Sequence, residues 1–229
     1  EPNTYDTAAE RKEKQLLRSL WGNWPECKQQ LSRSHRRSII TFLADRPGDF
    51  KGAWARLNQD LRSLYLAAFQ SQLWNELLTR AFREECPEAT FVDVPLKTGK
   101  LPFPTELPAG GAERLRTMQL PLPSARLKPD EIDDPVVRGL LERTLAARGL
   151  EARQLRGKYP RGSFFSKGWR PAMIRLDELQ LEQSEDELYP GQIKLRLSFD
   201  LPRGSYATIL VKRITDAVGI APSGRRKLD

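Results

Sequence analysis

Residues 198–208 (SFDLPRGSYAT) place a cation beside the start of a predicted helix, an arrangement that can bind a phosphate group. Pro202 and Gly204 predict a tight turn, and we expect a positive φ at Gly204. The first backbone N–H groups of the following helix attract anions because they have no partner within the helix. The residues of this predicted phosphate-binding turn are Arg203, the helix cap Ser205 and the later cation Lys212.

The segment 153–170 interleaves cations with aromatic residues, a composition that suits a nucleic-acid strand. Cations contact phosphates, and aromatic rings stack on exposed bases. The candidate binding cations of the segment are Lys158, Arg161, Lys167 and Arg170. The aromatic residues Phe164, Phe165 and Trp169 have an equal alternative role as core anchors of an ordinary basic loop, and different rings can take different roles.

A long helix is predicted from about residue 58 to 82, with apolar residues over a wide arc that predicts burial on much of its circumference. Ser71 and Asn75 lie four residues apart in this helix and therefore share a face. Such an interior polar stripe either bonds to neighbouring backbone or lines a cleft. The structural role is the favoured interpretation.

The composition favours a polyanionic partner. Lysine and arginine number 38 against 30 acidic residues, a formal charge of +8 over 229 residues. This balance is typical of proteins that bind nucleic acid, although a merely basic surface has the same balance. The single histidine, His35, lies among arginines at a polar helix start and is expected at the surface. Cys27 and Cys86 match no disulfide or metal-binding pattern, which fits reduced cytosolic thiols and no metal.

The sequence predicts neither a membrane span nor a cofactor site. No apolar run approaches the ~20 residues that a span requires. Neither a GxSxG elbow nor a glycine-rich nucleotide-binding loop occurs. The opening residues, EPNTYDTAAERKEK, do not resemble a signal peptide, so we expect a cytoplasmic protein. They also differ from an initiator region, which predicts that the chain is a piece of a longer protein.

The elements that would position these residues are helices followed by a small sheet, which is an α+β fold. Helices are predicted at 7–20, from Ser34, from Asp49, at 58–82 and at 135–148, the last capped by Asp134 and stopped by Gly149. Prolines recur in 86–128 and predict mostly irregular but partly ordered chain, with a short strand at 91–94. Residues 172–176 are predicted to pair with a half-buried strand at 192–199.

Five stretches, in the same order and spread over most of the chain, resemble the TruD family of tRNA pseudouridine synthases. They are LRSLYLAAFQSQLWN (61–75), MQLPLPS (118–124), GLEARQLRG (149–157), WRPAM (169–173) and LSFDLPRGSYATILVKRI (197–214). The last stretch is the most specific, and the proline-rich middle matches poorly.

The resemblance implies two domains: a helical family-specific inserted domain at 1–168, including the proline-rich excursion 86–128, and the C-terminal part of the catalytic domain at 169–229. Members of the family isomerise a uridine of tRNA to pseudouridine without a cofactor. An aspartate acts on the flipped nucleotide, the glycosidic bond breaks, and the base is rejoined through carbon. The resemblance also implies that Arg203, Ser205 and Tyr206 help to form the cleft.

The family's catalytic aspartate motif does not occur in these residues, and neither does its Asn-aromatic-Phe-Gly…Arg-Phe-Gly motif. We therefore nominate no catalytic residue here and expect the aspartate upstream of this chain. The leading hypothesis is part of a tRNA pseudouridine synthase, inactive as this chain alone, with tRNA as partner and a monomer favoured. The alternatives are a catalytically inactive RNA-binding module and a helical protein-interaction scaffold built on 1–82.

Overall fold

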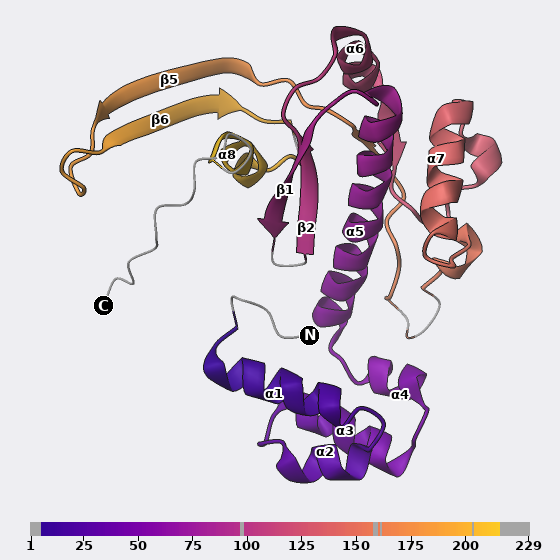
Figure 1. The fold of residues 1–229 in the computed structure, drawn as a ribbon. Coiled ribbons are helices and arrows are strands. Elements are labelled where there is room, and N and C mark those ends of the chain that lie inside the picture. The colour runs from indigo at the N-terminus through magenta and orange to yellow at the C-terminus, as the bar shows by residue number, and fades with distance from the viewer. Residues whose placement is uncertain (1–5, 97–98, 158–159, 161, 203, 216–229) are drawn as a thin grey trace. The chain divides into compact units, whose positions relative to one another are not determined.

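The computed structural model describes residues 6–96, 99–157, 160, 162–202 and 204–215, and its helices and small sheets confirm the predicted α+β class (Figure 1). The helices are α1 (Ala8–Ser19), α2 (Trp24–Gln30), α3 (His35–Asp45), α4 (Phe50–Ala55), α5 (Gln59–Glu85), α6 (Ala109–Thr117), α7 (Pro135–Ala146) and α8 (Ala207–Thr215). The strands are β1 (Phe91–Leu96), β2 (Gly99–Pro104), β3 (Gln119–Pro121), β4 (Trp169–Pro171), β5 (Asp177–Glu185) and β6 (Ile193–Asp200). Short 3-10 turns lie at Pro129–Glu131 and Ala152–Gln154.

The chain divides into two units. Unit 1 comprises Glu1–Glu76, Pro95–Gly99 and Pro121–Gly168, and unit 2 comprises Leu77–Val94, Lys100–Leu120 and Trp169–Asp229. Helix α5 contributes 59–76 to unit 1 and 77–85 to unit 2. No helix in the described part of the chain is long and apolar enough to cross a membrane.

The first helices of unit 1 begin where side chains cap them. The Ser34 hydroxyl accepts a hydrogen bond from the Arg37 N–H at 3.2 Å, and the Asp49 carboxylate accepts one from the Gly52 N–H at 2.8 Å. The predicted helices from these caps are confirmed, as is the helix at 7–20. Their apolar faces enclose a core made of Trp24, Cys27, Leu31, Ile40, Phe42, Leu43 and Ala53.

Helix α7, also in unit 1, begins and ends as predicted. The Asp134 carboxylate accepts a hydrogen bond from the Val136 N–H at 2.9 Å, and Pro135 takes the first helical position, where no N–H is needed. Gly149 follows the helix with a φ of +63°. The buried face consists of Val137, Leu140, Leu141, Thr144 and Leu145.

Helix α5 is less buried than its sequence predicts. Leu73 is completely buried, but Leu64 and Tyr65 are 62% and 51% exposed. The prediction of burial on much of the circumference is therefore wrong for the first half of the helix. Periodicity identifies which residues share a face, whereas burial depends on what other segments cover that face.

Residues 86–128 are more regular than their prolines predict. Strand β1 pairs with β2, β3 pairs with β4, and α6 lies between them in sequence. The expectation of mostly irregular chain is therefore wrong, while the strand predicted at 91–94 is confirmed. Every strand of a two-stranded sheet is an edge, where proline is tolerated because one side of the strand needs no N–H donor. Val94 and Phe103 form the buried pair of the β1–β2 sheet.

Strand β6 pairs with β5, so the predicted pairing with 172–176 is wrong. The two strands are antiparallel, with Leu181 opposite Leu197 and Gln183 opposite Leu195, and they form one long hairpin in Figure 1. The Asp186 carboxylate closes its turn by accepting the Leu188 N–H at 2.8 Å. Because a short turn joins β5 to β6, bringing these two strands together costs less conformational entropy than pairing β6 with residues further away in the sequence.

The apolar face of this hairpin is only partly buried, with Leu197 and Phe199 half-buried on it and other residues exposed. Leu181, Ile193 and Leu195 are 59%, 62% and 52% exposed. The predicted strand is confirmed, and its predicted burial holds for Leu197 and Phe199 but is wrong for Ile193 and Leu195.

The turn before α8 adopts the predicted conformation, with a φ of +90° at Gly204. The Ser205 N–H donates a hydrogen bond to the Pro202 carbonyl at 3.1 Å and closes the turn. Because α8 begins at Ala207, Tyr206 is the residue that precedes it. The prediction that Ser205 caps the helix is therefore wrong by one residue, since Ser205 still belongs to the turn.

Gly204→Val is expected to lower the free energy of unfolding by about 1–3 kcal/mol, because a β-branched side chain is strained at positive φ. Among the described residues beyond its chain neighbours, no atom lies within 4 Å of the position that a Cβ would take, so the penalty is conformational and not steric. Denaturant unfolding measures the change. Gly204→Asn is the control and should lose less stability, since asparagine tolerates positive φ better. Equal stability of the valine and wild-type proteins would contradict the prediction.

Candidate nucleic-acid interface

Gln70 holds the aromatic, basic segment of unit 1 in place. Its side chain is 5% exposed, and its Nε2 donates to the carbonyls of Pro123 at 2.9 Å and Ser166 at 2.8 Å. Its Oε1 accepts the Ser166 N–H at 3.2 Å. Helix α5 is thereby joined to two segments that lie far away in the sequence. A backbone bond from the Leu122 N–H to the Gly168 carbonyl at 2.9 Å runs between the same segments.

The two adjacent rings next to Ser166 take different roles. Phe165 is 8% exposed, and its ring centroid lies 6.4 Å from that of Phe69. Phe164 is 54% exposed, and the Arg126 guanidinium lies 5.4 Å from its ring centroid. Phe165 is thus a core anchor, whereas Phe164 presents a ring to solvent. An exposed ring beside a guanidinium can stack on a base while the cation contacts phosphate.

The charges around this ring are only partly neutralised. Lys167 forms an ion pair with Glu131 at 3.1 Å, and both side chains are exposed. The hydrogen bond from Lys167 holds the pKa of the Glu131 carboxyl below its usual value. Arg126 makes no ion pair with any described residue, and its side chain contacts the Phe164 ring instead. Arg126 is therefore the cation that the structure places against the Phe164 ring.

The other candidate residues are divided between the units or lie outside the described residues. Lys158, Arg161 and Arg203 lie outside the described residues. In unit 1, Ser71 and Asn75 are half-buried on α5. Three candidates of unit 2 are half-buried, namely Arg170 on β4, Ser205 in the turn and Lys212 on α8. Two residues of the same unit are more exposed, with exposed fractions of 62% for Tyr206 and 43% for Trp169.

Sequence reasoning missed two residues of this surface. Gln70 lies inside the stretch FQSQLWN, where the polar stripe was assigned to Ser71 and Asn75 although Gln70 is the buried polar side chain. Arg126 follows the stretch MQLPLPS, and its distance in the sequence from Phe164 left no local signal of their contact.

A cation beside an exposed ring, on a basic α+β chain, is the kind of surface that RNA-binding proteins present. A family model described as tRNA pseudouridine synthase D (TruD) matches residues 2–103. The predicted resemblance to the TruD family is confirmed by this match and by relatives along most of the chain.

Three relatives illustrate the extent of the similarity. The "Probable tRNA pseudouridine synthase D 2" of Methanocaldococcus jannaschii is 26% identical over an alignment of 222 residues that covers 90% of this chain and 51% of the relative. The "tRNA pseudouridine synthase D" of Leptospira interrogans is 26% identical over 213 residues, 89% of this chain and 50% of the relative. The "tRNA pseudouridine synthase D" of Aquifex aeolicus is 25% identical over 202 residues. That alignment covers 88% of this chain and 49% of the relative. The chain thus spans about half the length of the curated relatives it matches.

Proposed function

We propose that this chain is part of a tRNA pseudouridine synthase that isomerises uridine to pseudouridine in tRNA. The proposal rests on the similarity of about nine-tenths of the chain to relatives that carry this name. The chemistry requires a base extruded from its stack, a basic cleft and a carboxylate that acts on the flipped nucleotide. Since the aspartate motif of the family does not occur among these 229 residues, the role of this chain is to hold the RNA.

The two predicted domains are part of the proposal. Residues 1–168 form the family-specific inserted domain, and 169–229 form the C-terminal part of the catalytic domain. The exposed part of the apolar face of the β5–β6 hairpin, at Leu181, Ile193 and Leu195, supports the second assignment. Contiguous apolar surface of this kind marks a place where another protein segment packs, which fits strands that belong to a larger domain.

The exposed Phe164 ring binds an unstacked base of the tRNA, and Arg126 contacts a neighbouring phosphate. The 5.4 Å approach of the guanidinium to this ring and the exposure of the ring support this role. Further RNA contacts of the proposal come from Lys158, Arg161, Lys167 and Arg170, and from the turn and helix that carry Arg203, Ser205, Tyr206 and Lys212.

Phe164→Ala is expected to raise the KM for tRNA about tenfold in the protein that contains this chain, with little change in kcat. The loss of one base–ring stack is worth about 1–3 kcal/mol of binding free energy, and ~1.4 kcal/mol is a factor of ten. The measurement is the rate of pseudouridine formation in tRNA as a function of tRNA concentration. Phe164→Trp is the matched control, because it retains an aromatic face and should keep the KM near that of the wild type.

The same assay tests the function itself. Failure of the wild-type protein to form pseudouridine in any tRNA, combined with salt-sensitive tRNA binding, would replace the proposal with a catalytically inactive RNA-binding module. Failure to bind RNA at low salt would favour a protein-interaction scaffold. Equal KM values for the alanine and wild-type proteins would refute the role of Phe164 but leave the activity in place.

A further inference from the structure

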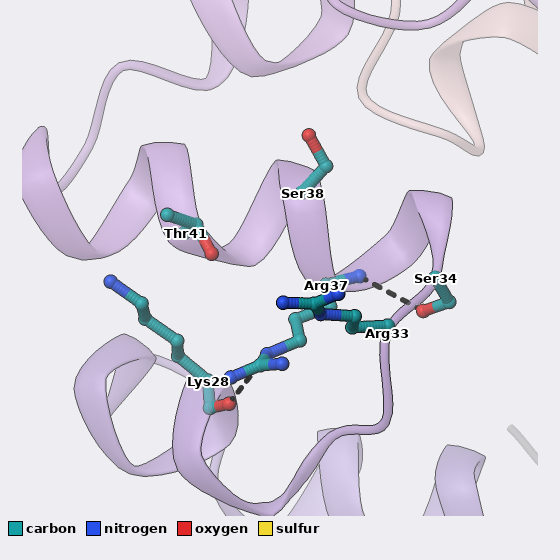
Figure 2. A pocket seen from close by; sticks show the side chains of 6 residues that line it. All are labelled: Lys28, Arg33, Ser34, Arg37, Ser38 and Thr41. Atoms are coloured by element: carbon teal, nitrogen blue, oxygen red, sulfur yellow. Dashed lines mark hydrogen bonds between the residues drawn. The ribbon is translucent and has the colours of Figure 1, made fainter.

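A second basic surface lies in the helical part of unit 1, where the end of α2 faces the start of α3. A shallow, open hollow of about 260 Å³ lies there. Figure 2 shows the side chains that line it, which are Lys28, Arg33, Ser34, Arg37, Ser38 and Thr41. Three are cations and three carry hydroxyl groups, so the lining is rich in hydrogen-bond donors and contains no carboxylate.

No described residue neutralises the cations of this hollow. Lys28, Arg33 and Arg37 form no ion pair with any described residue. Arg36, which does not line the hollow, pairs instead with Glu13 at 3.2 Å. The positive charge is therefore retained at the hollow.

One of the cations is fixed in place before any ligand binds. The Arg37 Nε donates a hydrogen bond to the Lys28 carbonyl at 3.1 Å, a bond that joins α3 to α2 and is drawn in Figure 2. The terminal nitrogens of Arg37 form no hydrogen bond with described residues and remain available to a ligand. Part of the entropy loss of ordering a flexible side chain has thus already occurred in the folded protein.

This charge arrangement is unfavourable for the isolated helix. The first turn of α3 contains no acidic residue and carries His35, Arg36 and Arg37. The start of a helix has a partial positive charge that favours anions and disfavours cations. Like charges that converge at this end repel one another, and a bound anion would relieve that repulsion.

We propose that this hollow binds a phosphate of the RNA backbone, at a place on α2 and α3 separate in the sequence from the Phe164 surface. The inference rests on the proposed function, which supplies RNA as the polyanion. An open hollow lined by cations and hydroxyls suits a phosphodiester within a long chain, because the rest of the chain can leave the hollow on either side. Arginine supplies forked donors to phosphate oxygens, and lysine adds a point charge.

The test compares tRNA binding by the wild-type chain with binding by the double variant Lys28→Gln, Arg33→Gln across a series of salt concentrations. These two side chains make no hydrogen bond or ion pair with described residues, so the fold should survive their replacement, and a circular dichroism melt checks this. We expect about tenfold weaker binding at low salt. The plot of the logarithm of the association constant against the logarithm of the salt concentration has a negative slope. The magnitude of that slope should decrease by about 1 for each lost cation.

The control variant is Lys51→Gln. Lys51 is an exposed cation on α4 of the same unit, and it does not line the hollow. A single equivalent charge loss there should leave the slope within error of the wild-type value. An equal decrease per lost cation in the control and the double variant would reduce the effect to net charge and overturn the proposed site.

The ligand class is tested separately by following the backbone amide signals of 34–41 during titrations with a short RNA oligonucleotide and with an acidic peptide. Signals that shift with RNA support the proposal, and signals that shift only with the peptide overturn it. Unchanged tRNA affinity and slope in the double variant would also overturn it while leaving the proposed function intact. No tRNA binding by the wild-type chain at low salt would instead refute both.

Discussion

Gly111→Ala should lower the free energy of unfolding by about 3 kcal/mol, the upper part of the range for overpacked sites. Gly111 lies in α6, where a Cβ would come 2.3 Å from the Cys86 sulfur and 2.3 Å from the Glu85 carbonyl oxygen. Both atoms belong to unit 2, at and just beyond the end of α5. The Glu85 oxygen is a backbone atom and cannot move aside by a rotamer change, so the helices themselves must separate.

The neighbouring Gly110 provides a matched control. It occupies the same helix, but outside that helix's own backbone no atom of the part of the chain that the structure describes lies within 4 Å of the position of its added Cβ. Gly110→Ala should therefore be neutral or stabilise the protein by up to ~1 kcal/mol, because alanine is the better helix former. Denaturant unfolding of the two variants measures the contrast. Equal stability of the two alanine variants would show that α6 and the end of α5 approach each other less closely than described.

Gln70→Leu should lower the free energy of unfolding by about 2–4 kcal/mol. Leucine fills a similar volume but cannot replace the three hydrogen bonds of the amide with Pro123 and Ser166. Each buried polar group left unpaired costs about 1–3 kcal/mol. The bonds to Ser166 are only partly buried, so water can satisfy some of these groups and the sum is reduced.

Gln72→Leu is the control for this prediction. Gln72 lies on the same helix and is exposed, with one long hydrogen bond of 3.4 Å to Glu76. Its replacement should change stability by no more than ~0.5 kcal/mol, as is usual for surface sites. The Gln70 variant should also bind tRNA less tightly, because Ser166 adjoins the two phenylalanines of the candidate interface. Wild-type stability in that variant would refute the structural role of Gln70.

Helix starts and turns that depend only on nearby residues were predictable from the sequence. The helix starts at Ser34, Asp49 and Asp134 were expected because each cap bonds to a backbone N–H two or three residues later. Positive φ at Gly204 was likewise expected from the turn around it. The order of five short stretches was sufficient to indicate the TruD family, although the proline-rich middle was misjudged.

The candidate interface was only half predictable. The segment 153–170 was identified by its composition, but composition could not decide which of two adjacent phenylalanines is buried. That decision depends on Phe69, which packs on Phe165, and on Arg126, which lies over Phe164. Neither contact could be predicted from the residues near this segment, because Phe69 and Arg126 lie far from it in the sequence.

The sequence by itself determined where most helices start, the basic character of the chain and its likeness to a tRNA-modifying family. The tertiary structure alone decided that β6 pairs with β5, that Gln70 is buried whereas Ser71 is half-buried, and that Phe164 is exposed. It also decided that Lys28 of α2, Arg33 between the two helices and Arg37 of α3 line one hollow. The physical reason is the range of the interactions involved. A cap or a turn is stabilised by residues within one helical turn of it, whereas burial and shared surfaces depend on segments that folding brings together from distant parts of the chain.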